Sequence, residues 1–173
     1  MAISNKISDA MNKQINAEMY SAYMYLSMAA WFEKENFAGF ANWMKVQAQE
    51  EMTHAMKFYD FIIERQGAVK LMAIDCPPSD WKDPLAIFQD ALKHEQKVTG
   101  LINGLTDIAI AEKDYASQIF LQWFVTEQVE EEASADAVVQ QLKLMAGAPG
   151  AILMLDRELG RRVFTPPPAE ASD

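Results

Sequence analysis

The sequence predicts an all-α protein: a four-helix bundle with one long crossover and a short fifth helix near the C-terminus. Four long segments carry apolar side chains at alternating steps of three and four residues, the repeat of one helix face. The 173 residues include only seven glycines and seven prolines, too few to interrupt those segments. The connections between them are short, long and short, which suits a bundle with a single crossover.

The first two helices are expected over residues 5–34 and 38–66, with Gly67 ending the second. The few residues between them imply antiparallel neighbours. The first buried face consists of Ile7, Met11, Ile15, Glu18, Ala22, Tyr25 and Ala29. The second consists of Phe40, Met44, Gln47, Glu51, His54, Phe58 and Phe61.

The third helix is expected to begin at Asp83-Pro84, because aspartate is a good N-cap and proline suits the first helical position. The fourth is expected from about Asp114 to about residue 145. The third face consists of Leu85, Phe88, Leu92, Glu95, Thr99, Ile102, Leu105 and Ala109. The fourth consists of Phe120, Phe124, Gln128, Glu131, Ala135, Val138, Leu142 and Met145.

The crossover between the second and third helices decides the topology. Extended at roughly 3.3 Å per residue, residues 67–83 reach about 55 Å. A helix of 28 residues is about 42 Å long, so the third helix can start parallel to the second. The crossover is expected to pack on the bundle through four apolar side chains, Val69, Leu71, Ile74 and Trp81.

The C-terminal part follows a break at Gly147-Ala-Pro149-Gly150. A short amphipathic helix is expected over 151–162. Residues 1–164 are therefore interpreted as one domain, and the proline-rich residues 165–173 as a flexible, solvated tail.

Composition excludes several classes of partner. Fifteen Lys and Arg against 25 Asp and Glu give a net charge of −10, whereas nucleic acid and anionic membranes select basic surfaces. No stretch approaches the roughly 20 apolar residues of a membrane helix. Cys76 is the single cysteine, so an intrachain disulfide is impossible, and the N-terminus lacks the apolar core of a secretory signal. We therefore expect a cytoplasmic protein without nucleic-acid or membrane partners.

Every one of the four buried faces is interrupted near its middle by a residue that can bind a metal. These residues are Glu18, Glu51, His54, Glu95, Gln128 and Glu131. Any one of these carboxylates, taken alone, is typical of a solvent-exposed residue at the edge of a helix face. Four helices interrupted at the same depth should instead bring these side chains together in the middle of the bundle. Burying unpaired carboxylates costs several kcal/mol, and no lysine or arginine lies on these faces at that depth. Bound cations are therefore expected, and oxygen donors with one imidazole suit iron, manganese or zinc.

Glu51 is the strongest candidate to bridge two metal ions. Its partner three residues later, His54, projects from the same helix face.

The motifs resemble those of a ferritin of the non-haem bacterial or archaeal type. The resemblance covers essentially the whole chain and is carried by residues 16–26, 49–55, His94-Glu95 and 120–133. It implies a ferroxidase that oxidises Fe(II) with O2 or H2O2 at a diiron centre. It also implies a homo-oligomeric, hollow shell of 24 subunits that stores ferric mineral.

The resemblance also assigns roles to individual residues. It places the first iron at Glu18, Glu51 and His54, and the second at Glu51, Glu95 and Gln128 with Glu131 nearby. A third iron site would use Glu50, Glu127 and Glu130. Each of these three precedes a core position by one residue, about 100° around the helix, and the alternative is that they are plain surface acids.

Two aromatic residues join the implied site. Tyr25 would lie beside the diiron centre, where it could hydrogen-bond a ligand or donate an electron, and the alternative is a core tyrosine. Trp123 is a weaker candidate for such a redox role.

Related families fit less well. The chain is similar to a bacterioferritin at Met52, because that family has a haem-ligating methionine at this place. The fourth helix, however, has Gln128-x-x-Glu131 where bacterioferritins have Glu-x-x-His, so no haem is expected. Mini-ferritins carry a helix in the crossover, which Pro77-Pro78 disfavours here. A rubrerythrin-like diiron oxidase without a cavity stays possible, although no Cys-x-x-Cys is present. A purely structural bundle with incidental buried acids is the remaining alternative.

Overall fold

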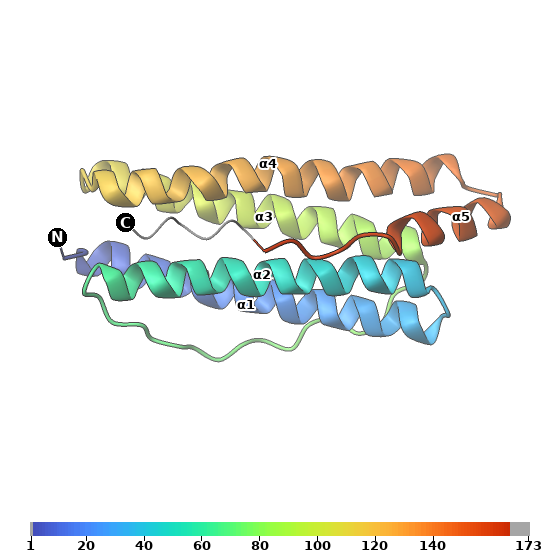
Figure 1. Cartoon of the computed structure of the whole chain (residues 1–173), viewed down its shortest axis with the longest axis horizontal. Coiled ribbons are helices and arrows are strands. Elements are labelled where there is room, and N and C mark those ends of the chain that lie inside the picture. Colours follow the sequence, from blue (N-terminus) through green and yellow to red (C-terminus); the bar gives the residue numbers. More distant parts are fainter. Residues whose placement is uncertain (1, 167–173) are drawn as a thin grey trace.

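The computed structural model describes residues 2–166, and this part of the chain forms five helices and no strands (Figure 1). The helices are α1 (Asn5–Lys34), α2 (Ala38–Glu64), α3 (Pro84–Ala111), α4 (Tyr115–Leu144) and α5 (Pro149–Leu159). The predicted all-α class is confirmed. The limits of α1, α2 and α4, and the start of α3, lie within about two residues of their predictions.

The fifth helix is displaced from its prediction. It covers Pro149–Leu159, whereas the sequence indicated 151–162. Pro149 occupies the first helical turn, where its fixed φ favours a start, and Gly160 is the C-cap. Residues 162–166 are therefore non-helical, and the remainder of the predicted tail, 167–173, lies outside the described residues.

Side-chain caps explain where three of the long helices begin. A hydroxyl or carboxylate accepts a hydrogen bond from the backbone N–H three residues later, which satisfies a donor that the helix leaves unpaired. The pairs are Ser4 with Ile7, Asp83 with Ala86 and Asp114 with Ser117.

Helix α2 is capped from α5. Its N-cap residue, Phe37, makes no side-chain cap bond. Instead, Asp156 Oδ1 accepts hydrogen bonds from the backbone N–H groups of Gly39 at 2.8 Å and Phe40 at 2.9 Å. The approach requires glycine, because a Cβ on Gly39 would lie 1.6 Å from the carbonyl oxygen of Asp156.

The crossover runs the length of the bundle, so α3 is parallel to α2 as predicted (Figure 1). It is fastened to α1 by side-chain amides. Asn12 Nδ2 donates to Ala68 O at 3.0 Å, and Asn12 Oδ1 accepts from the Lys70 N–H at 2.6 Å. Asn16 Nδ2 donates to Ala73 O at 3.0 Å.

The apolar side chains of the crossover behave differently from the prediction. Val69 and Trp81 pack against the core, but Leu71 and Ile74 are 66% and 42% exposed. The prediction was wrong for those two because polar bonds to the backbone hold the segment and leave these side chains outside.

Two hydrophobic clusters form the core, one toward each end of the bundle. One surrounds Phe32, Phe40 and Phe88, and the other surrounds Phe58 and Phe124. Between them lies a band of buried polar side chains contributed by α1 to α4. The architecture therefore places a polar layer inside an otherwise apolar bundle.

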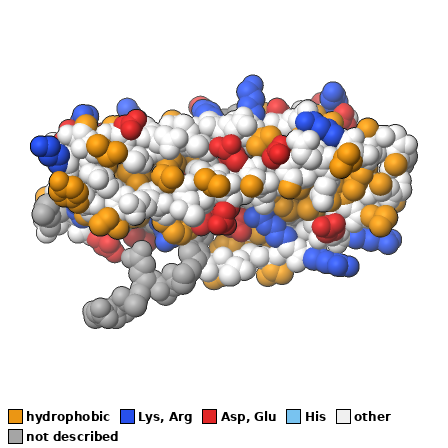
Figure 2. All heavy atoms as spheres, turned by 90° about the horizontal axis from the view of Figure 1, so that it is seen from above, with side chains coloured by type: hydrophobic (Ala, Val, Ile, Leu, Met, Phe, Trp, Pro, Cys, Tyr) orange, Lys and Arg blue, Asp and Glu red, His pale blue; other side chains and the backbone are white. Residues whose placement is uncertain are grey.

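The surface mixes both signs of charge with apolar side chains, as Figure 2 shows for the face seen from above. On α4, Ile119, Val129 and Leu144 are exposed. None of the helices in the described range is both long and apolar enough to cross a membrane.

Candidate metal centre

The six residues that interrupt the buried faces all lie in the polar layer. Their relative exposures run from 1% for Glu18 and Glu95 to 7% for Glu131. The remaining three, Glu51, His54 and Gln128, are 2% to 4% exposed. The structure thus brings together, from four helices, the residues that the sequence placed at one depth.

Glu18, Glu51 and His54 form the most compact group. Their ligand atoms all lie within 4.8 Å of one another, and His54 Nδ1 is 3.5 Å from Glu51 Oε2. Glu18 Oε1 accepts a hydrogen bond from Gln14 Nε2 at 2.8 Å. Glu18 Oε2 is buried and has no hydrogen-bond partner within the described chain. An oxygen lone pair left unsatisfied among other carboxylates is suited to a cation.

Glu95, Gln128 and Tyr25 form the opposite side of the layer. The Tyr25 hydroxyl donates to Glu95 Oε1. Gln128 Nε2 lies 3.3 Å from three acceptors: Glu95 Oε2, the Glu95 carbonyl and Thr99 Oγ1. Because the NH2 group of Gln128 faces these acceptors, a metal ion would meet its carbonyl oxygen.

Gln47, predicted only as part of the second buried face, is also a member of the layer. It is fully buried, and its Nε2 donates to Glu131 Oε2 at 2.5 Å and to Glu51 Oε1 at 3.4 Å. Its position one helical turn before Glu51, on the same face, was the available signal.

Burial dominates the electrostatics of the layer. Desolvation, followed by the charge of Glu51, raises the pKa of Glu18 to about 8. Desolvation also raises the pKa values of Glu95 and Glu131 to about 7, and that of Glu51 well above its usual range. The acids hold protons because burial disfavours their charged form. A divalent cation would supply positive charge and displace the protons.

Tyr25 stays a hydroxyl. Burial, together with the nearby Glu95, raises its pKa well above the usual value. It therefore serves the layer as a hydrogen-bond donor.

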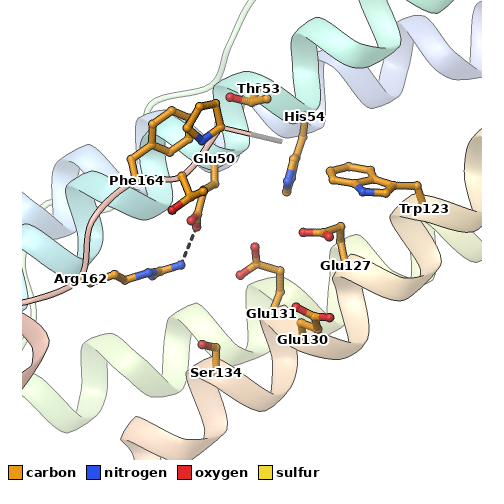
Figure 3. A pocket seen from close by; sticks show the side chains of 12 residues that line it. Glu50, Thr53, His54, Trp123, Glu127, Glu130, Glu131, Ser134, Arg162 and Phe164 are labelled. Carbon is orange, nitrogen blue, oxygen red and sulfur yellow. Dashed lines mark hydrogen bonds and ion pairs between the residues drawn. The ribbon is translucent and has the colours of Figure 1, made fainter. Parts of the chain in front are cut away.

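A pocket of about 310 Å³ opens beside the buried layer, between α2, α4 and the segment after α5 (Figure 3). The three residues predicted for a third iron site, Glu50, Glu127 and Glu130, all line it. The compact ligand group at this pocket is different, however: His54, Glu127 and Glu131 lie within 4.8 Å of one another. Glu50 is instead ion-paired with Arg162 at 2.5 Å.

Trp123 also lines this pocket. Its ring is 5.4 Å from the His54 ring in an edge-on arrangement, and Lys57 Nζ lies 4.5 Å from its centroid. Met52, the residue considered for haem, is 45% exposed on α2.

Comparison with known proteins gives consistent matches. The family model described as ferritin-like domain matches residues 8–145. A bacterial non-heme ferritin of Bacteroides fragilis is 51% identical over 160 residues, covering 92% of this chain and 99% of that protein. A bacterial non-heme ferritin of Staphylococcus aureus is 38% identical over 162 residues, covering 94% and 98%.

Solved structures agree. An engineered closed form of the Archaeoglobus fulgidus ferritin has a TM-score of 0.94 and 54% identity, covering 95% of this chain and 100% of that one. An open pore ferritin from the same archaeon has a TM-score of 0.92 and 53% identity, covering 93% and 98%. With the predicted resemblance confirmed in sequence and in structure, the chain belongs to the ferritin family.

Proposed function

We propose that this ferritin is a ferroxidase that oxidises Fe(II) at the buried layer and stores the ferric product inside a hollow homo-oligomer of 24 subunits. The observation that carries the proposal is Glu18 Oε2, which is buried without a hydrogen-bond partner in the described chain, within a layer of carboxyl groups whose pKa values are raised by burial. The family's role in iron storage and the archaeal ferritins with the same fold support it.

Two Fe(II) ions are the substrates in this proposal. Glu18, Glu51 and His54 would hold one, and their atoms lie within 4.8 Å. Glu51, Glu95 and Gln128 would hold the other, with Glu131 at its edge. Carboxylates stabilise Fe(III) more than Fe(II), so the donor set favours oxidation. The neutral Gln128 binds less strongly than a carboxylate would, which suits an ion that must leave.

The oxidant takes two electrons, one from each iron. With two protons, O2 becomes H2O2, and with two electrons and two protons, H2O2 becomes two waters. The carboxyl protons released when iron binds are a local supply. Tyr25, bonded to Glu95, positions that ligand and is suited to donate an electron.

The ferric product would leave through the pocket on the α2 and α4 side. Glu50, Glu127 and Glu130 are proposed to bind a third iron on this path, with His54 and Glu131 at its inner end. We place the protein in the cytoplasm, with Fe(II), the oxidant and copies of itself as its partners.

Anaerobic Fe(II) titration of the apoprotein, followed by O2 and by size-exclusion chromatography with light scattering, tests the proposal. A large assembly that binds two or three irons per chain and retains ferric mineral is expected. A small oligomer that binds iron without retaining mineral would instead indicate a diiron oxidase. Absence of saturable binding would mean that the buried acids are structural.

A further inference from the structure

Among the described residues, Arg162 is the only arginine or lysine that lines the pocket of the proposed third iron site. It lies in the non-helical segment after α5 and reaches back over α2 (Figure 3). Its Nη2 donates to Glu50 Oε2 at 2.5 Å, and its Nη1 donates to Gln47 Oε1 at 2.8 Å. Its guanidinium carbon lies 4.5 Å from the centroid of the Trp43 ring.

These contacts distinguish the Arg162–Glu50 pair from an ordinary surface ion pair. Both side chains are only 23% exposed, and the guanidinium also contacts Gln47 and Trp43, which are 0% and 4% exposed. Because the Arg162 guanidinium is held by Glu50, Gln47 and Trp43, it loses little conformational entropy when the ion pair forms, and salt screens the pair only weakly. Because arginine has only hydrogen-bond donors, the Gln47 side-chain oxygen must face Arg162. The Gln47 NH2 group therefore faces Glu131.

The pairing divides the predicted third cluster. Glu127 already lies at metal-binding distance from His54 and Glu131, but Glu50 is turned to Arg162. We propose that Arg162 acts as a built-in counter-ion that occupies Glu50 in the metal-free protein, so that a third metal ion must displace it. This inference rests on the proposed function, because it needs metal ions to reach that pocket.

Two consequences follow for the affinity of the third position. The metal ion must break a charge-assisted hydrogen bond before it gains Glu50 as a ligand. It must also enter against the positive charge of the guanidinium, which repels it. Arg162 is therefore an affinity-determining residue, and it keeps the third position weaker than the two buried ones, as transit of ions requires.

Titration of the full-length apoprotein with Zn(II), followed calorimetrically, tests this without redox chemistry. In Arg162→Gln, the third zinc is expected to bind about tenfold more tightly than in the wild type, while the two buried ions change less than about twofold. Arg162→Lys, which restores the charge, should return the third affinity close to wild type. Arg161→Gln, the same change at the exposed neighbour, should behave as wild type.

A second substitution links the effect to Glu50. Adding Glu50→Gln to Arg162→Gln should abolish the gain in third-site affinity. An unaltered or weaker third zinc in Arg162→Gln, in a protein with wild-type circular dichroism, would overturn the counter-ion role and leave the proposed function intact. A wild type that binds no zinc would overturn both.

Discussion

Individual acids in the middle of the bundle work against the stability of the metal-free fold. Glu18 keeps one oxygen without a partner, and desolvation raises its pKa to about 8. Glu95 and Glu131 follow at about 7. Such groups are retained at a cost to folding, which is the pattern of a binding site rather than of a structural core.

The pKa of Glu18 leads to a prediction for thermal stability. Because the folded protein holds this proton up to about pH 8 and the unfolded chain loses it near pH 4.5, the fold becomes less stable as pH rises between those values. The metal-free protein should therefore melt about 5 °C lower at pH 8 than at pH 6. Scanning calorimetry with Glu18→Gln as the comparison checks this, since the variant should show a flatter dependence. A metal-free wild type that is more stable at pH 8 would contradict it.

Glu51 offers the sharpest test of metal binding. Glu51→Gln keeps the side-chain shape but removes the charge that both proposed iron positions share, so divalent-cation affinity should fall by at least about 100-fold. Anaerobic titration with Co(II) or Fe(II) measures it. Glu64→Gln, an exposed acid on the same helix, should leave binding unchanged. Normal binding in Glu51→Gln would mean that the ions bind away from Glu51.

Most residues of this layer could be predicted from the sequence, because positions on one buried helix face recur with a fixed period. Glu18, Glu51, His54, Glu95, Gln128 and Glu131 are all buried where the period places them. Arg162 was missed, since it belongs to no helix face, and its contact with Glu50 joins positions 112 residues apart. The expectation of bound cations concerned the six residues on the buried faces, and Arg162 pairs with Glu50, which is not one of them.

Among the elements, the short helix α5 stabilises the start of α2. Its Asp156 caps α2, and its Leu155 is 1% exposed in the core cluster. No sequence pattern near Phe37 indicates that Asp156 caps α2. The limits of the helices were therefore predictable, but the contact between α5 and α2 was not. The extended crossover was predictable from its length and prolines, whereas its fastening by Asn12 required the tertiary structure.

Gly39 tests the junction of α5 with α2. Gly39→Ala places a methyl group 1.6 Å from the Asp156 carbonyl oxygen, so α5 must leave its site. Losing the cap and the burial of Leu155 should cost roughly 3 kcal/mol of unfolding free energy. Thermal or urea unfolding measures it. Gly100→Ala, in α3 with nothing within 4 Å, should instead stabilise by about 0.5–1 kcal/mol. Equal stability of the two variants would refute the junction.

The whole molecule separates its apolar core from its buried acids. Hydrophobic clusters at both ends of the bundle hold the fold, and the buried acids are confined to the layer between them. The outer side of α1 and the crossover exposes apolar side chains, among them Tyr23, Leu26 and Leu71. If the chain assembles into a shell, a face of this kind is where another copy would pack.

Assembly can be tested on that face. Leu26→Glu places a charge among exposed apolar groups, so the assembly should dissociate toward smaller species, whereas Leu26→Met should retain the wild-type mass. Light scattering coupled to size-exclusion chromatography distinguishes them against a single-chain mass of 19.5 kDa. An unchanged mass in Leu26→Glu would place the subunit contact elsewhere.

The cap that Asp156 provides to α2 also bears on the order of events during synthesis. The backbone donors of Gly39 and Phe40 emerge from the ribosome more than a hundred residues before their acceptor, since the bonded positions are 117 and 116 apart. The start of α2 must therefore remain frayed in the nascent chain, however early the first hairpin forms. A chain that stops before Asp156 therefore lacks the acceptor for both donors, and its second helix begins without this cap.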